Sequence, residues 1–194
     1  MKKIEYSDLD WENPDIVIKF YESNYQSITI KEYINNKEDV VQLLNVKLQY
    51  INSLTKNRNY LKALRYSNEI KEFLNKHDSE QYYRNFCTEN DYYSGVIQGG
   101  LQNYKTSIRI FSNLSKKDPD NVVYNNWYRQ MRVNYITKNI KYLNYLGGFI
   151  VLLSITLDFG FNIDLDNWVL LLGLFSFICS WIIPKIIVKV FNVF

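Results

Sequence analysis

A sharp change in composition at Leu143 constrains this chain more than any other feature. From Leu143 to Phe194 the only charged residues are Asp158, Asp164, Asp166, Lys185 and Lys189. The residues before it are dense in charge, asparagine and tyrosine. Two apolar runs, residues 142–161 and 168–184, each approach the ~20 residues that an α-helix needs to cross ~30 Å of hydrocarbon. We therefore expect residues 142–194 to form a C-terminal two-helix transmembrane hairpin.

The charges that flank the two runs predict their orientation. Lys138 and Lys141 precede the first run, and Lys185 and Lys189 follow the second. The segment between the runs carries three carboxylates and no base. Since basic residues stay on the cytoplasmic side, both termini are expected in the cytoplasm. Membrane lipid is one expected partner of this unit. No apolar stretch follows Met1, so no secretory signal is predicted.

The hairpin is interpreted either as a plain anchor or as part of a pore. Gly147, Gly148 and Gly173 offer small surfaces where two helices can approach closely, and Pro184 is expected to end or bend the second helix. A pore built from this unit would have to be a homo-oligomer. Its candidate lining residues are hydroxyls inside the runs and carboxylates of the linker: Ser154, Ser176, Ser180, Asp158, Asp164 and Asp166.

The part before the membrane unit is predicted to be a cytosolic helical domain, residues 38–141. Apolar residues recur at helical spacing over 38–55, 59–76, 80–98 and 103–117. A fifth helix opens near Val123 and meets no proline or glycine before Gly147, so it is expected to run into the membrane. Residues 1–37 form an N-terminal segment without one predicted fold: 15–21 favours a short helix, and 27–34 fits a strand or a short helix. The predicted fold class is all-α.

Residues 103–121 resemble the second helix and closing turn of a tetratricopeptide repeat. Ser107 stands at the small position, Phe111 at the aromatic position and Pro119 at the closing proline. Gly95 falls where the first helix of the repeat keeps its glycine, and Ala63 is the small residue of a similar stretch over 59–65. The resemblance covers roughly half the chain and implies stacked helix pairs, which generally bind partners.

The spacing departs from that family. Tyr60 and Tyr104 are 44 residues apart, whereas the repeat has 34, and Gly99–Gly100 interrupts the pattern.

Basic charge gathers next to the membrane. Residues 101–141 hold eight bases and two acids, whereas residues 1–100 hold 13 bases and 15 acids. One interpretation is a belt that attracts anionic lipid. The other is a polyanion site for a nucleotide or oligonucleotide, in which bases neutralise phosphates and aromatic rings stack on nucleobases. Its candidate residues are Lys105, Arg109, Tyr128, Arg129, Arg132, Tyr135 and Lys138.

No pattern predicts enzyme chemistry. His77 is the only histidine and lies in a polar run, and the two cysteines are isolated, so neither a zinc site nor a histidine-activated nucleophile has its residues. Walker, dinucleotide-binding and GxSxG motifs are absent from the sequence. We predict no catalytic residues, no metal and no cofactor.

A helical cytosolic domain followed by a few spans resembles the transmembrane effectors of bacterial antiphage systems, and most closely the channel effectors of Hailong systems. That resemblance implies a ligand-gated oligomeric channel in the bacterial inner membrane, controlled by a nucleotide oligomer. The alternative is a membrane-tethered tetratricopeptide-like scaffold that binds a protein partner.

Overall fold

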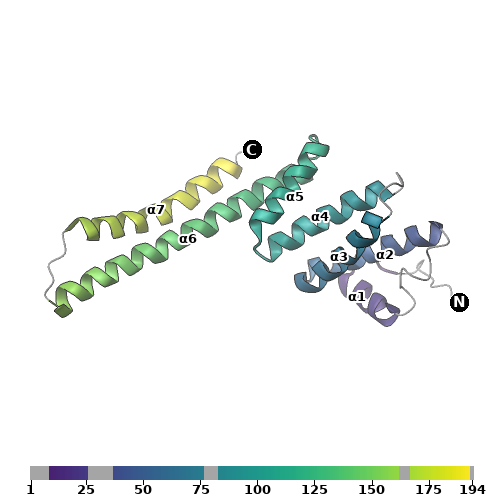
Figure 1. The fold of residues 1–194 in the computed structure, drawn as a ribbon, viewed down its shortest axis with the longest axis horizontal. Coiled ribbons are helices and arrows are strands. Elements are labelled where there is room, and N and C mark those ends of the chain that lie inside the picture. The colour runs from purple at the N-terminus through teal and green to yellow at the C-terminus, as the bar shows by residue number, and fades with distance from the viewer. Residues whose placement is uncertain (1–8, 26–36, 77–82, 162–166, 193–194) are drawn as a thin grey trace. The chain divides into compact units, whose positions relative to one another are not determined.

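The computed structural model describes residues 9–25, 37–76, 83–161 and 167–192. All regular secondary structure in these ranges is helical, which confirms the all-α prediction. The helices are α1 (Pro14–Ser23), α2 (Lys37–Lys56), α3 (Tyr60–Lys76), α4 (Arg84–Gly100), α5 (Tyr104–Lys117), α6 (Val122–Phe161) and α7 (Asn167–Asn192) (Figure 1). The chain divides into two compact units, residues 1–128 and 129–194.

The helices coincide closely with those predicted from periodicity. The predicted 38–55, 59–76, 80–98 and 103–117 are α2, α3, α4 and α5, and the short helix predicted over 15–21 is α1. The strand or helix considered for 27–34 lies outside the described residues. The unit boundary after Tyr128 precedes the change in composition at residue 142, because packing and apolarity change at different points along α6.

α1 begins where its sequence allows a well-capped start. The Asn13 side chain accepts hydrogen bonds from the backbone N–H groups of Asp15 (3.1 Å) and Ile16 (3.4 Å). Pro14 occupies the first helical position, where its missing N–H costs nothing. The cap satisfies the first backbone donors of α1, which packs on α2 and buries Val17 and Tyr21.

Two helix pairs, α2–α3 and α4–α5, are closed by the same kind of turn. After α2, the N–H of Asn59 donates to the carbonyl of Leu54 (2.8 Å) and the N–H of Arg58 to that of Thr55 (3.0 Å). After α4, Asn103 donates to Gln98 (2.9 Å) and Gln102 to Gly99 (3.0 Å). Arg58 and Gln102 adopt left-handed φ values of 58° and 61°. Both turns are Schellman motifs, so the 44-residue spacing of Tyr60 and Tyr104 marks a repeated helix pair.

The second pair is held by residues that the sequence singled out. Ser107 and Phe111 of α5 are fully buried, and the Ser107 hydroxyl donates to the Gly95 carbonyl of α4 at 2.7 Å. A Cβ added at Gly95 would lie 2.8 Å from Cε2 and Cζ of Phe111. The Phe111 ring stacks on Trp127 with centroids 5.6 Å apart. Gly95 therefore permits an approach of α4 and α5 that a larger side chain would prevent.

The core of the first unit combines aliphatic residues with a tyrosine cluster. The rings of Tyr21 and Tyr50 stack with centroids 3.9 Å apart, and Tyr66 meets both edge-on. Burial is the main cause that raises the pKa of all three phenols. Around them pack the aliphatic side chains of Leu44, Leu48, Ile51, Leu54, Ile70, Leu74 and Ile97.

Polar groups also lie inside this core. Asn90 of α4 accepts from the Ser67 hydroxyl (3.0 Å) and donates to the Ser67 carbonyl (3.1 Å), and Ser67 Oγ lies 2.7 Å from Ser94 Oγ. Lys47 is only 5% exposed, with Nζ 3.8 Å from a Glu69 carboxylate oxygen. Burial lowers the pKa of Lys47, and Glu69 offsets part of that effect.

Candidate functional site

α6 contains the segment best suited to cross a membrane. Among the described residues, Val122–Leu157 is the one stretch that is long and apolar enough to cross a membrane, judged by length and composition. Few residues of its most apolar window are buried inside the protein, unlike those of a typical core helix. The prediction that the helix opening near Val123 continues without a break into the first apolar run is confirmed, because α6 runs to Phe161.

The second predicted span has weaker support. The described apolar part of α7, Leu171–Ile183, is shorter than a bilayer requires, so the transmembrane hairpin as a whole stays a prediction. α7 itself continues to Asn192, so of the two alternatives for Pro184, that it ends or that it bends the second helix, the ending is wrong and the bend stays a prediction. A proline deprives a helix of one N–H donor and disturbs the preceding turn, but an apolar helix can absorb this locally and continue.

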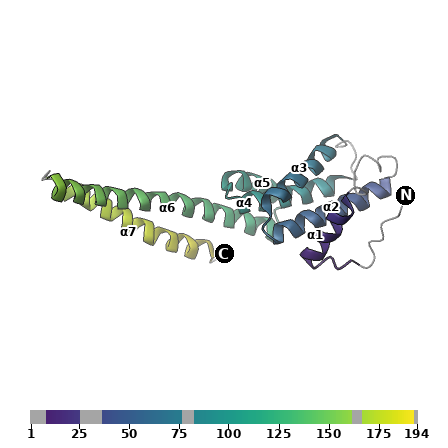
Figure 2. The same cartoon turned by 90° about the horizontal axis from the view of Figure 1, so that it is seen from below.

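Within the second unit α6 and α7 lie side by side and run in opposite directions, as both views show (Figures 1 and 2). A Cβ added at Gly173 of α7 would lie 2.7 Å from Cγ2 of Val151 and 3.3 Å from the carbonyl oxygen of Gly147, both in α6. The close approach predicted from the glycines thus occurs at Gly147 and Gly173. Nothing lies within 4 Å of a Cβ added at Gly148.

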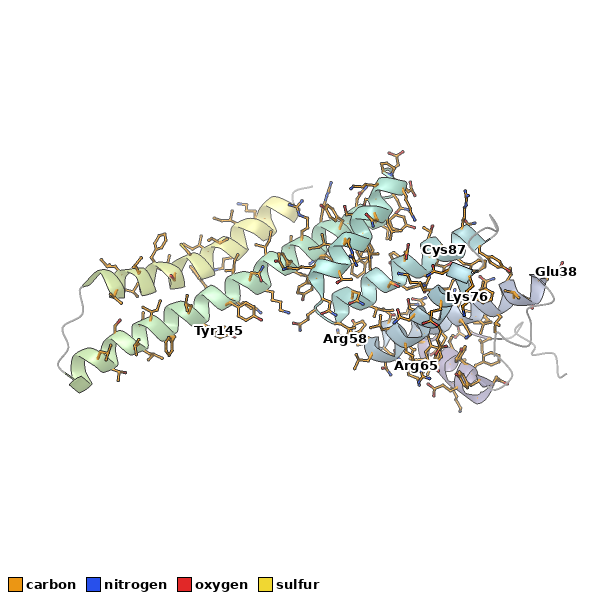
Figure 3. The ribbon with its side chains drawn as sticks, viewed as in Figure 1. Glu38, Arg58, Arg65, Lys76, Cys87 and Tyr145 are labelled. Atoms are coloured by element: carbon orange, nitrogen blue, oxygen red, sulfur yellow. The ribbon has the colours of Figure 1, made fainter. Side chains whose placement is uncertain are left out.

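Large apolar side chains cover the outer surface of this helix pair. Tyr145 of α6 is 72% exposed (Figure 3), Leu152 is 66% exposed, and Phe175 and Trp181 of α7 are exposed to a similar degree. Further exposed apolar residues here are Leu146, Phe149, Leu153, Ile155, Leu171, Leu172, Leu174, Ile178, Ile182, Ile183 and Ile186. So large a continuous apolar surface is unusual for a soluble monomer and typical of contact with lipid or with other chains.

The pore candidates occupy different environments. Ser154 is buried, and its hydroxyl donates to the Ile150 carbonyl at 2.8 Å. Its seven-residue spacing from Gly147 puts it on the α6 face that meets α7. Ser176 is half-buried on α7, and Ser180 also lies on α7. Asp158 lies in the last turn of α6, whereas Asp164 and Asp166 fall outside the described residues.

The sequence list of pore candidates omitted one exposed hydroxyl. Thr156 faces outward on α6, and its hydroxyl donates to the Leu152 carbonyl at 2.8 Å. Its place inside the first apolar run, 142–161, is the same signal that marked Ser154 and could have added it to that list.

The polyanion candidates belong to two units. Lys105 and Arg109 are exposed on α5 one turn apart, and Tyr128 is half-buried on the part of α6 that belongs to the first unit. In the second unit Arg129 and Arg132 are exposed. Tyr135 and Lys138 are half-buried. By helical spacing, Tyr128, Arg132 and Tyr135 share one face of α6, whereas Arg129 and Lys138 lie toward its two edges.

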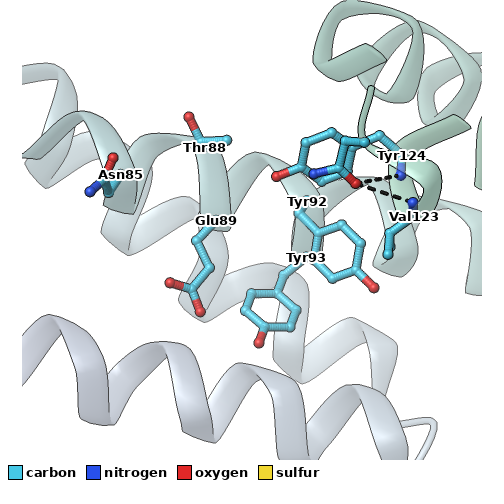
Figure 4. A pocket seen from close by; sticks show the side chains of 8 residues that line it. Asn85, Thr88, Glu89, Tyr92, Tyr93, Val123 and Tyr124 are labelled. Atoms are coloured by element: carbon cyan, nitrogen blue, oxygen red, sulfur yellow. Dashed lines mark hydrogen bonds between the residues drawn. The ribbon is translucent and has the colours of Figure 1, made fainter. Parts of the chain in front are cut away.

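Sequence reasoning missed a pocket in the first unit. It has a volume of about 510 Å³ and opens between α4 and the start of α6 (Figure 4). Its lining residues are Asn85, Thr88, Glu89, Tyr92, Tyr93, Asn121, Val123 and Tyr124. Among the described residues, no three His, Cys, Asp or Glu side chains are grouped as metal ligands would be.

Comparison with known proteins gives no family. No family model, curated protein or solved structure matches the chain. The functional argument therefore depends on the geometry of the two units themselves.

Proposed function

We propose that this chain is the subunit of an oligomeric membrane channel, a pore-forming effector of a bacterial antiphage system. In this proposal a ligand such as a nucleotide oligomer gates the channel at the cytosolic helical domain, and the protein performs no catalysis. The observation that carries the proposal is the apolar surface of α6 and α7, which extends over several turns of both helices. Lipid and neighbouring subunits are the partners that would cover such a surface.

The length of α7 favours a second span despite its short apolar run. Its 26 residues extend for about 39 Å at 1.5 Å per residue, more than the hydrocarbon thickness. Near its C-terminal end, Lys185 Nζ lies 3.5 Å from the centroid of the Trp181 ring. Trp and Lys side chains at one level are typical of a membrane interface, with the ammonium reaching toward water. Both termini would then lie in the cytoplasm of an inner-membrane protein.

The continuity of α6 supports gating from the cytosolic side. The basic residues Arg129, Arg132 and Lys138 and the apolar residues after 142 belong to one unbroken helix. A phosphate-bearing ligand on those bases would exert its force on the same backbone that enters the membrane.

The test combines subunit number with conductance. The detergent-purified full chain is analysed by light-scattering mass determination and then reconstituted in a planar bilayer, with and without added oligonucleotides. A closed oligomer that passes current is the expected result. Reversing Arg129 and Arg132 to Glu should abolish the ligand response, while Lys71→Glu/Lys76→Glu on α3 is the matched control and should leave it intact.

The alternative, a tethered scaffold for a protein partner, is favoured by the repeated α2–α3 and α4–α5 pairs with their shared turn. Stacked helix pairs of this kind expose surfaces that bind polypeptides. A monomer or dimer without current would refute the channel and support the scaffold. An oligomer that conducts, but whose current responds to oligonucleotides equally in both charge-reversed variants, would support the channel and refute the polyanion site.

A further inference from the structure

The pocket between α4 and the start of α6 has a chemistry opposite to that of the basic segment. Among the described residues its lining holds one ionisable carboxylate, Glu89, and three phenol rings, Tyr92, Tyr93 and Tyr124, with neither lysine nor arginine. Asn85, Thr88 and Asn121 add neutral polar groups. Carboxylates and aromatic rings together attract organic cations, because the carboxylate carries a negative charge and the ring face is the negative end of its quadrupole.

The aromatic side of the pocket is held in place. The Trp127 indole N–H donates to the Tyr92 hydroxyl at 3.2 Å, and the centroids of the Tyr92 and Phe111 rings are 6.0 Å apart. Tyr124 lies 6.0 Å from Tyr92, centroid to centroid, at an angle of 41°. The backbone at Tyr124 is fixed by the helix cap of α6, since the Asn121 side chain accepts from its N–H at 3.2 Å (Figure 4). These rings need little reorganisation to receive a ligand.

The acidic side of the pocket is formed by the carboxylate of Glu89. Glu89 is half-buried on α4 one turn from Tyr93, and both side chains project from the same side of the helix (Figure 4). Burial raises the pKa of Glu89, while a hydrogen bond from Tyr93 partly offsets it. Burial is the main cause that raises the pKa of Tyr124, and the negative charges of Asp118 and Glu89 add to it.

We propose that this pocket binds a guanidinium group, with Glu89 as its carboxylate partner and the ring faces of Tyr92 and Tyr124 as its stacking surfaces. A guanidinium is favoured over an ammonium because it is planar, stacks on rings and pairs with a carboxylate through two parallel N–H donors. The pocket volume exceeds that of the head group, which leaves room for the chain that carries it. The site is independent of the proposed channel and takes a ligand of opposite charge to that of the basic segment.

The test uses calorimetric titration of the full chain in detergent with three probes. These are ethylguanidinium, the capped peptide acetyl-Gly-Arg-Gly-amide, and the same peptide with citrulline, which keeps the shape of arginine without its charge. The arginine peptide should bind at least tenfold more tightly than the citrulline peptide. If ethylguanidinium binds as well as the arginine peptide, the ligand is a small guanidine; if it binds much more weakly, the ligand is an arginine of a polypeptide.

Two variants and one control locate the site. Glu89→Gln keeps the volume and a hydrogen bond to Tyr93 but removes the charge, and Tyr124→Leu removes a ring; each should weaken arginine-peptide binding at least tenfold. Glu72→Gln, the same change at an exposed position of α3, should leave binding unchanged. Thermal unfolding of each variant verifies the fold. Equal binding of both peptides, undiminished binding in Glu89→Gln, or no heat at millimolar probe would overturn the proposal.

Discussion

Replacing Gly95 by alanine tests the packing of α4 against α5. The added methyl would lie 2.8 Å from two carbons of the Phe111 ring and 3.2 Å from Cγ2 of Ile110. The ring cannot move aside easily, because it is fully buried and stacks on Trp127. Neither can the helices separate without stretching the 2.7 Å hydrogen bond from Ser107 to the Gly95 carbonyl.

Two opposing effects set the magnitude. Overpacking in a filled core costs about 1–3 kcal/mol. Alanine in place of a helical glycine returns about 0.5–1 kcal/mol through backbone entropy. The central values, about 2 and about 0.75 kcal/mol, leave a net loss of about 1.3 kcal/mol in the free energy of unfolding, which lowers the melting temperature of a unit of this size by about 3–8 °C.

The assay is thermal unfolding of the detergent-purified full chain, followed by circular dichroism. Gly148→Ala is the matched control, since the same methyl meets nothing within 4 Å there and should be neutral or slightly stabilising. Combining Gly95→Ala with Phe111→Leu removes the clashing ring carbons, so the double variant should be less destabilised than the sum of the two single variants. A Gly95→Ala protein as stable as the original, or additive effects in the pair, would refute the packing argument.

Four further outcomes are expected from the first unit. Asn90→Ala should lower the free energy of unfolding by about 1–3 kcal/mol in urea titrations, because it removes two buried hydrogen bonds to Ser67. An effect near zero, as at an exposed position, would contradict this. Arg58→Gly should stabilise by up to about 1 kcal/mol, since glycine adopts φ 58° without strain, and a loss of stability would count against the Schellman turn. Lys47→Met should leave the free energy of unfolding unchanged or raise it by about 1 kcal/mol, because it removes a buried charge while Glu69 keeps access to solvent. A large loss of stability would mean that the ion pair with Glu69 outweighs the cost of burying Lys47. The buried tyrosines hold their protons more tightly in the folded state, and the pKa of Tyr93 is raised to about 12. The stability present below pH 10 should therefore fall as the pH rises toward 12. Melting temperatures that stay unchanged over that range would exclude this linkage.

Local signals predicted the helices because each α-helix displays its own 3.6-residue period. The ends of α2, α3 and α5 were predicted within one residue, and the resemblance to a tetratricopeptide repeat pointed to Gly95, Ser107 and Phe111 as packing positions. These features depend on residues within one helix or one hairpin. The first apolar run was recognised for the same reason, since a span is a continuous stretch.

The contacts that sequence reasoning missed join residues far apart in the chain. The pocket brings Glu89 and Tyr92 of α4 to Tyr124 of α6, and the Tyr92–Trp127 hydrogen bond bridges 35 positions. The buried polar cluster likewise joins Ser67 to Asn90, 23 positions away. No local pattern distinguishes such tyrosines, serines and asparagines from those on a solvated face. The sequence left open whether Pro184 ends or bends the second helix, because helix propensity in water penalises proline more than an apolar environment does, and α7 continues past it.

The paired glycines and rings of the first unit impose a rule on how this sequence can change over generations. A Cβ at Gly95 would collide with Phe111, and one at Gly100 would lie 2.4 Å from the ring of Tyr60. Each glycine is thus the complement of one aromatic side chain, not an independent position. Descendant sequences that gain a side chain at 95 should lose the ring at 111, and those that gain one at 100 should lose the ring at 60. The two members of each pair should therefore vary together, and selection should remove a change at one member alone.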